Sequence, residues 1–103
     1  MKNLSGLMKQ AQKLQSKMAE MQAEVGNRKV SAQAGGGMVE AVVNGKQELV
    51  SLRIDPEVVA PDDVEMLQDL IQAAVNEALN RSREMMAAEM AKLTGGMNIP
   101  GLF

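Results

Sequence analysis

Three lysines near the N-terminus have the spacing of a binding surface. Lys9, Lys13 and Lys17 recur every four residues, so on a helix they climb one side about 6 Å apart. No acidic residue before Glu20 neutralises them. Ammonium groups in such a row suit the phosphates of a nucleic-acid backbone, which supply affinity without sequence information. The alternative is a solvated polar face, which is common on helices.

Two arginines further along the chain are weaker candidates for the same role. Arg81 and Arg83 lie in a second apolar-periodic segment, and Lys92 follows them. Glu77 stands four residues before Arg81 and Glu89 three before Lys92, which predicts local ion pairs that occupy both cations. Arg83 is therefore the freest of the three.

The glycine run Gly35-Gly36-Gly37 raises the question of a phosphate-binding loop. Such loops lead into a helix, whose free N–H groups meet the anion. Here the glycines precede the strand-like sequence MVEAVVN. The later Gly45-Lys46 lacks both the first glycine and the final Ser or Thr of the P-loop pattern. The run is interpreted as a hairpin turn.

The remaining side chains do not suggest catalysis. The chain has no histidine and no cysteine, which excludes Cys or His zinc sites and the usual nucleophile pairs. The acids Asp62, Asp63 and Glu65 are interpreted as favourable charges in the first turn of a helix, not as a metal site. The sequence therefore predicts a protein that is not an enzyme and that needs no cofactor, metal or small-molecule substrate.

The lysine row belongs to a segment with an unbroken heptad pattern. Apolar residues recur at steps of three and four over three repeats, and they predict a helix over about residues 3–25, ended by Gly26-Asn27. We call these positions the seam. The seam residues are Leu4, Leu7, Ala11, Leu14, Met18, Met21 and Val25. All three lysines lie off the seam, which is narrow and suits one partner helix.

The rest of the chain predicts three strands and a second long helix. Apolar residues alternate over about residues 28–33, 38–44 and 48–54, with Val50, Leu52 and Ile54 expected on one face of the last. Glycine turns separate these strands, so an antiparallel meander is expected. A wide apolar stripe then predicts a helix over about residues 62–93 that packs on the sheet. Gly95-Gly96 should end it, leaving a flexible tail over residues 95–103.

Both helices are too long for the sheet they would cover. Strands of six or seven residues span roughly 20–25 Å, whereas the second helix would reach roughly 48 Å. The helix ends should project with their apolar seams exposed, and the sheet should have two open edges. Pairing two copies solves both problems, so we expect a homodimer with twofold symmetry and paired helical arms.

Charge and hydropathy favour a localised anionic partner. Residues 1–29 carry six cations and two acids, a net charge of +4, although the whole chain is at −2. One domain over residues 1–103 is expected from the length. No signal sequence or transmembrane run is found, which predicts an intracellular, cytoplasmic protein. Only one aromatic residue is present, so base stacking on single strands is disfavoured and duplex DNA is the preferred nucleic acid.

The whole sequence resembles a known family. The matching blocks are NLSGLMKQAQKLQSKMAEMQ, AGGGMVEAVVNGKQELVSLRIDPEVV, DDVEMLQDLIQAAVNEAL and KLTGGMNIPG. They are similar in order to the YbaB/EbfC family of bacterial nucleoid-associated proteins. The resemblance implies an α+β fold with an α-β-β-β-α subunit, a tweezer-shaped homodimer, and a nucleoid location. It also implies DNA binding that alters DNA conformation, with effects on gene expression. It attributes the DNA contacts to the arms, matching Lys9, Lys13 and Lys17, with Arg81 and Arg83 less closely.

The residues also allow one alternative function, the binding of another protein. Nine internal methionines would suit a coiled-coil protein-binding clamp or chaperone-like adaptor, whose flexible apolar arms hold a client helix. The unpaired lysine row argues against that reading. Dependence on salt separates the two, because phosphate binding weakens steeply with ionic strength while apolar contacts do not.

Overall fold

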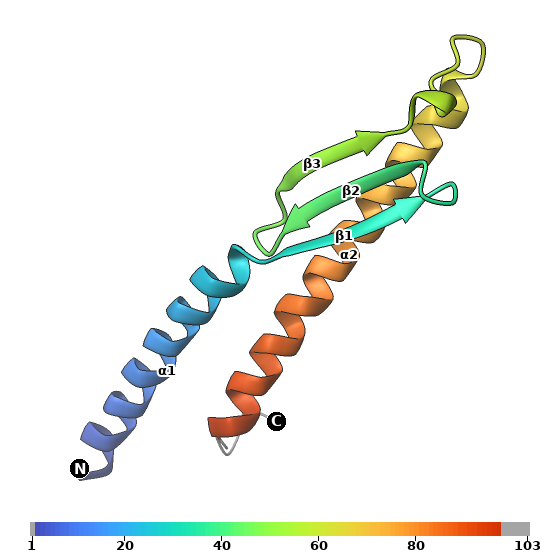
Figure 1. Cartoon of the computed structure of the whole chain (residues 1–103). Coiled ribbons are helices and arrows are strands. Elements are labelled where there is room, and N and C mark those ends of the chain that lie inside the picture. Colours follow the sequence, from blue (N-terminus) through green and yellow to red (C-terminus); the bar gives the residue numbers. More distant parts are fainter. Residues whose placement is uncertain (1, 98–103) are drawn as a thin grey trace.

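The computed structural model describes residues 2–97, which form two long helices and a three-stranded sheet (Figure 1). The order is α1 (Lys2–Gly26), β1 (Lys29–Ala34), β2 (Val39–Asn44), β3 (Leu49–Ile54), the short 3-10 helix η1 (Pro56–Val58) and α2 (Val64–Met97). The strands pair antiparallel in the order β1-β2-β3. The predicted α+β subunit with an antiparallel meander is therefore confirmed.

The core is thin and is made of small residues. α2 lies across β1 and β2, and the buried side chains between them are almost all alanine or valine. These residues are Ala32, Val39, Ala41, Val43, Val58, Ala74 and Ala78. Small side chains let the helix approach the sheet closely, and the larger residues of the predicted stripe pack around them. The expectation that this stripe packs on the sheet is confirmed.

One buried residue of α2 is polar and was not predicted. Ser82 continues the i, i+4 row of Ala74 and Ala78, and it is fully buried. Its Oγ donates to the carbonyl of Asn44 at 2.7 Å and accepts from Nε2 of Gln47 at 2.7 Å. Asn44 is the last residue of β2, and Gln47 lies in the β2–β3 loop that follows it. Because both hydrogen-bonding roles of the hydroxyl are satisfied, Ser82 fastens α2 to this loop at little desolvation cost.

The glycine run forms a turn between strands, as expected. Gly35, Gly36 and Gly37 all have positive φ angles, of 63°, 67° and 94°. Residues with a Cβ seldom adopt this conformation. No helix begins here, so the loop does not have the geometry of a helix-terminal phosphate site.

The face of β3 differs from the prediction because of a bulge. β3 has an irregular register opposite Val42 and Val43, where Val43 pairs with Leu49 and Val42 with Ser51. The extra residue is Val50. Leu49 and Leu52 therefore share the face of the buried β2 residues, and Val50 is not in register with them as the simple alternation predicted.

The ends of α2 also differ from the prediction. Asp62 and Asp63 precede the helix, and Asp63 Oδ1 accepts from the amide of Met66 at 3.2 Å, so this residue caps the helix from outside its first turn. At the other end, α2 runs through Gly95 and Gly96 to Met97. Glycine lowers helix stability without removing a backbone hydrogen bond, so two glycines did not end the helix. The predicted tail beyond residue 97 lies outside the described residues.

Both helices extend past the sheet, as the length comparison predicted. α1 and the C-terminal half of α2 project from the same end of the sheet as two arms (Figure 1). The molecule measures 72 × 23 × 16 Å along its principal axes. The root of α1 is held by the β2–β3 loop, where the buried Val25 and Gly26 lie against Gly45. A hydrogen bond of 3.1 Å from the Gly45 amide to the Arg28 carbonyl adds to this contact.

Gly45 is therefore the first position to test. Its φ is not positive, so it is required for close approach and not for turn conformation. A Cβ there would overlap the carbonyl of Val25 and come within 2.9 Å of the Gly26 Cα. We expect Gly45→Ala to lower the free energy of unfolding by about 1–3 kcal/mol, as overpacked sites do. Urea unfolding followed by circular dichroism measures the change.

Gly6→Ala is the matched control. Gly6 lies inside α1, and a Cβ there would meet nothing within 4 Å. We expect a gain of about 0.5–1 kcal/mol from the higher helix propensity of alanine. A neutral or stabilising Gly45→Ala would contradict the close contact at the root of α1.

Candidate nucleic-acid interface

The three lysines of the row lie exposed on the projecting part of α1. Lys9, Lys13 and Lys17 are all solvent-accessible. Lys17 lines a groove between α1 and α2, while Lys9 and Lys13 precede it in α1, nearer the N-terminus of the helix. Within residues 2–97, none of the three pairs with a carboxylate. Their charges are therefore available to a partner.

The two arginines lie on α2, and both have partners. Arg81 Nε pairs with Glu77 at 3.4 Å, as predicted, and its Nη1 donates to the carbonyl of Ser31 on β1 at 2.7 Å. Arg83 Nη1 donates to Oδ1 of Asn80 at 2.7 Å and forms no ion pair with any residue in the described range. Arg81 thus ties α2 to the edge of the sheet, and Arg83 has the more available charge.

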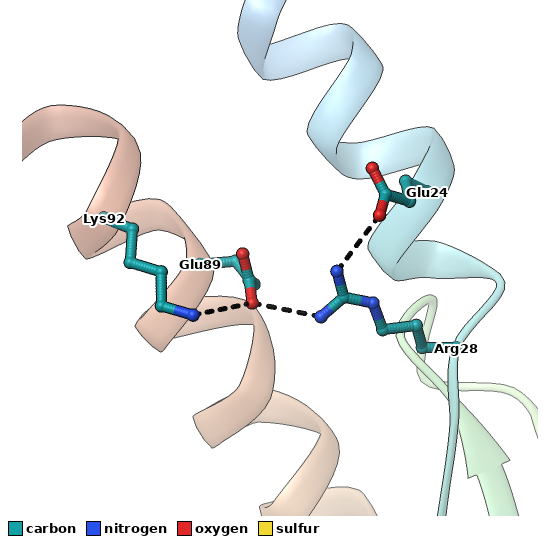
Figure 2. Close-up of polar contacts among 4 residues, drawn as sticks. All are labelled: Glu24, Arg28, Glu89 and Lys92. Atoms are coloured by element: carbon teal, nitrogen blue, oxygen red, sulfur yellow. Dashed lines mark hydrogen bonds and ion pairs between the residues drawn. The ribbon is translucent and has the colours of Figure 1, made fainter. Parts of the chain in front are cut away.

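An ion network joins the two arms at their root (Figure 2). Arg28 Nη1 donates to Glu89 Oε1 at 3.0 Å, and its Nη2 donates to Glu24 Oε1 at 3.2 Å. Lys92 Nζ reaches the same Glu89 oxygen at 3.3 Å, which confirms the predicted local pair. Arg28 follows α1, whereas Glu89 lies on α2, so this arginine connects the two arms directly. The Glu89 side chain is only 20% exposed.

The network sets the charge states of its members. Hydrogen bonds from Arg28 and then Lys92 lower the pKa of Glu89 below its ordinary value. The reciprocal bonds to Glu89 and Glu24 raise the pKa of Arg28. Both groups are therefore ionised at neutral pH, and the root of the arms is held by a charged contact.

The groove beside this network is electrically balanced. It is lined by three cations, three carboxylates and three apolar side chains. Its lining residues are Lys17, Glu20, Met21, Glu24, Val25, Arg28, Glu89, Lys92 and Leu93. Balanced charge gives an anion little net attraction, so the unbalanced positive charge of the arm lies outside the groove, at Lys9 and Lys13.

Sequence reasoning missed the role of Arg28. The four-residue spacing from Glu24 to Arg28 was a visible signal for one pair. Nothing in the sequence linked Arg28 to Glu89, which is 61 residues away. That contact depends on how the chain turns after α1 and on how α2 lies against the sheet.

Other kinds of site find no support in residues 2–97. No group of three His, Cys, Asp or Glu residues there is placed to hold a metal ion. In the same part of the chain, no helix is long and apolar enough to cross a membrane.

Known proteins resemble this chain over nearly its full length. The sequence model of the YbaB/EbfC DNA-binding family matches residues 1–97. A nucleoid-associated protein of Desulforamulus reducens is 62% identical over 98% of this chain and 96% of its own. A nucleoid-associated protein of Thermoanaerobacter pseudethanolicus is 57% identical over 98% of this chain and 91% of its own.

A solved structure has the same fold. The crystal structure of an uncharacterized protein from Helicobacter pylori superposes with a TM-score of 0.65. It covers 76% of this chain and 90% of its own, at 24% identity. At that identity the likeness supports the fold alone.

The Glu89 network predicts a pH-dependent stability difference. The pKa of Glu89 is depressed in the folded state. The stability that the ion network contributes is therefore fully present above the ordinary carboxyl pKa of 4.5, and it is lost as the pH falls through the lower folded-state pKa. Glu89→Gln should therefore lower the melting temperature near neutral pH, and the difference from wild type should be smaller at about pH 3, below the ordinary carboxyl pKa. Thermal unfolding at matched protein concentration measures both differences.

Glu84→Gln provides the control. Glu84 is exposed on α2 and takes no part in the network. We expect its melting temperature to follow wild type at both pH values. A Glu89→Gln difference that persists unchanged in acid would show that the ion network does not stabilise the arms.

Proposed function

The chain belongs to the YbaB/EbfC DNA-binding family, and we propose that it is a nucleoid-associated protein that clamps duplex DNA as a homodimer. In this proposal the arms grip the phosphates with little sequence specificity and alter the conformation of the DNA, with consequences for gene expression. The observation that carries the proposal is the row Lys9, Lys13 and Lys17, exposed and unneutralised by any described carboxylate on a projecting helix. The nucleoid is the proposed location.

The shape of the arms supports contact with a duplex. A helix that projects free of the sheet can lie along a phosphate backbone without a clash from the rest of the subunit. The chain has no aromatic residue before Phe103 to stack on bases. A partner held by ammonium groups alone would be bound by charge and shape, which favours a duplex of any sequence.

The second part of the proposal, the homodimer, is supported by an uncovered apolar strip beside α2. α2 packs on β1 and β2 and leaves β3 largely open. Leu49 and Leu52, on the same face as the buried residues of β2, remain 50% and 38% exposed. Val64 and Met66, in the first turn of α2, are also exposed. This strip extends the core face of the sheet, so a second copy placed against it would enlarge one hydrophobic core.

The protein-binding clamp remains the alternative function. Met21 and Leu93 are among the residues that line the groove between the arms, and they would accept an apolar helix. The groove has no excess of charge to compete with such a partner. Salt separates the two proposals, because phosphate contacts weaken as counterions are added whereas apolar contacts persist.

The DNA proposal is tested by the triple change of Lys9, Lys13 and Lys17 to glutamine. If all six lysines of a homodimer contact phosphates, the logarithm of the association constant falls against the logarithm of salt concentration with a slope of about −5. The variant should bind weakly, with a much flatter slope, to duplexes of every sequence. Fluorescence anisotropy of labelled random duplexes over a salt series measures both.

A charge-matched variant controls for net charge. Changing Lys29, Lys46 and Arg53 to glutamine removes three positive charges outside the α1 helix. We expect this control to keep most of the wild-type slope. Equal losses in the two variants would assign binding to overall charge and not to the arm. Absence of wild-type binding at low salt would reject the DNA proposal.

The dimer proposal is tested by Leu52→Asp. Twofold symmetry places the substituted residue in the interface twice, so the loss should be about 3 kcal/mol or more, roughly a hundredfold in the dissociation constant. Sedimentation equilibrium should then find monomers where wild type is dimeric.

Ser51→Asp is the control for the other face of β3. Ser51 pairs with Val42 and lies away from the strip. It should leave the dimer intact. Dimers that survive Leu52→Asp would contradict an interface at β3.

A further inference from the structure

The α1 arm is attached to the rest of the subunit near its C-terminal end. α1 packs mainly against α2 and has no extensive contact with any strand. It passes into β1 through the two-residue link Asn27-Arg28. Val25, next to this link, is buried, whereas Leu4 and Leu7 at the other end of the helix are exposed. The direction of the whole arm is therefore decided at its root.

One side-chain contact joins this root to α2. Arg28 lies in the link itself, and its Nη1 donates to Glu89 Oε1 at 3.0 Å (Figure 2). Among residues 2–97, it is the only hydrogen bond or ion pair that a side chain of residues 2–28 forms with α2. The same guanidinium donates to Glu24 of α1 at 3.2 Å, so it contacts both helices at once. We call the Arg28–Glu89 pair the inter-arm contact.

The geometry of the inter-arm contact restrains the angle between the helices. A guanidinium is planar and its N–H groups have fixed directions, so the two carboxylates that it joins are held in a set arrangement. Lys92 donates to the same Glu89 oxygen at 3.3 Å, which adds a second restraint on this carboxylate (Figure 2). The Glu89 side chain is also largely shielded from solvent, and partly buried pairs are screened less by salt than exposed ones.

A change of angle at the root would move the lysine row by a distance that matters for DNA. Lys9 precedes Arg28 by 19 residues, which is about 28 Å along a helix. A tilt of about 10° at the root would therefore displace Lys9 by roughly 5 Å. A charged hydrogen bond is only about 3 Å long. An arm without a fixed angle must lose this freedom when it binds, which weakens binding.

We propose that Arg28 is a positioning residue for DNA binding. Through the inter-arm contact it holds the α1 arm at the angle to α2 in which Lys9, Lys13 and Lys17 meet the phosphates of one duplex together. Arg28 itself lines the charge-balanced groove, so its role here is not that of a phosphate ligand. This inference rests on the proposed function, but the angle of the arm can be measured without DNA.

The angle of the arm is tested first, in the absence of DNA. The chain has no native cysteine, so spin labels can be attached at Gln12→Cys on α1 and Ala91→Cys on α2, both exposed positions. Labelled protein is mixed with an excess of unlabelled protein, so that pulsed electron paramagnetic resonance measures the distance within one chain. We expect a broader distance distribution in Glu89→Gln and in Arg28→Gln than in wild type, because each change removes the inter-arm contact.

Glu20→Gln is the matched control. Glu20 lines the same groove and forms no ion pair with any described residue, so the same loss of charge should leave the distance distribution unchanged. Arg28→Lys should give an intermediate width, because an ammonium group lacks the planar fork that holds two carboxylates. Circular dichroism checks that each variant is folded. A Glu89→Gln distribution as narrow as that of wild type would overturn the proposal.

DNA affinity then separates positioning from simple electrostatics, because the two predict opposite effects of Glu89→Gln. Removal of an acid increases the attraction for phosphate, so electrostatics alone predicts tighter binding. Loss of positioning instead predicts binding that is weaker by about tenfold, since the freed arm must be ordered when it binds. Glu20→Gln loses the same charge and should bind at least as tightly as wild type. Fluorescence anisotropy of a labelled random duplex at low salt measures all three proteins.

Other outcomes would contradict the positioning role. Tighter binding by both Glu89→Gln and Glu20→Gln would show that Glu89 acts only through its charge. A broader distance distribution with unchanged affinity would show that the inter-arm contact sets the angle of the arm without serving DNA binding. If wild type binds no duplex, the proposed function fails, while the distances still show whether the inter-arm contact sets the angle.

Discussion

The architecture depends on a mismatch of length. α2 has 34 residues, about 51 Å, whereas each strand beneath it has six residues, about 20 Å. Only part of the helix can bury its apolar stripe on the sheet. The rest projects, and α1 projects beside it from the same end of the sheet (Figure 1). A longer sheet would have covered these helices and left no arms.

The arms are distinguished from the body by charge and are attached to it by small, close contacts. Positive charge collects on α1, outside the balanced groove at its root. The attachment relies on Gly45, on the buried Ser82 and on the ion network of Arg28. The charged surface of α1 and the contacts that attach this helix lie at opposite ends of it. Surface residues of the arm can therefore change without loss of the fold.

Much of the fold could be predicted, because it follows from local periodicity. The heptad seam, the alternating strands and the wide stripe of α2 each depend on neighbouring residues. The errors arose where distant packing or register decides the outcome. The bulge at Val50 shifted one face of β3, and α2 continued through Gly95 because its backbone hydrogen bonds outweighed a modest propensity cost.

The candidate site was only partly predictable for the same reason. Spacing alone placed Lys9, Lys13 and Lys17 on one side of α1, and it identified the Glu77–Arg81 pair. The contact between Arg28 and Glu89 joins elements that meet only in the folded chain. The close contact at Gly45 could not be predicted either. An Asn-Gly pair indicates a turn, but it does not indicate that Val25 and Gly26 pack against that turn.

The continuity of α2 has a mechanical consequence. One unbroken helix, with no proline between Val64 and Met97, forms both the cover of the sheet and the second arm. α1 instead joins the sheet through the short link Asn27-Arg28. A sideways force on the α2 arm would bend one continuous helix whose other half is packed on the sheet. A sideways force on α1 would instead act at the short link Asn27-Arg28. The two arms are therefore attached in different ways, α2 through its own continuous helix and α1 through a short link that the Arg28–Glu89 contact braces against α2.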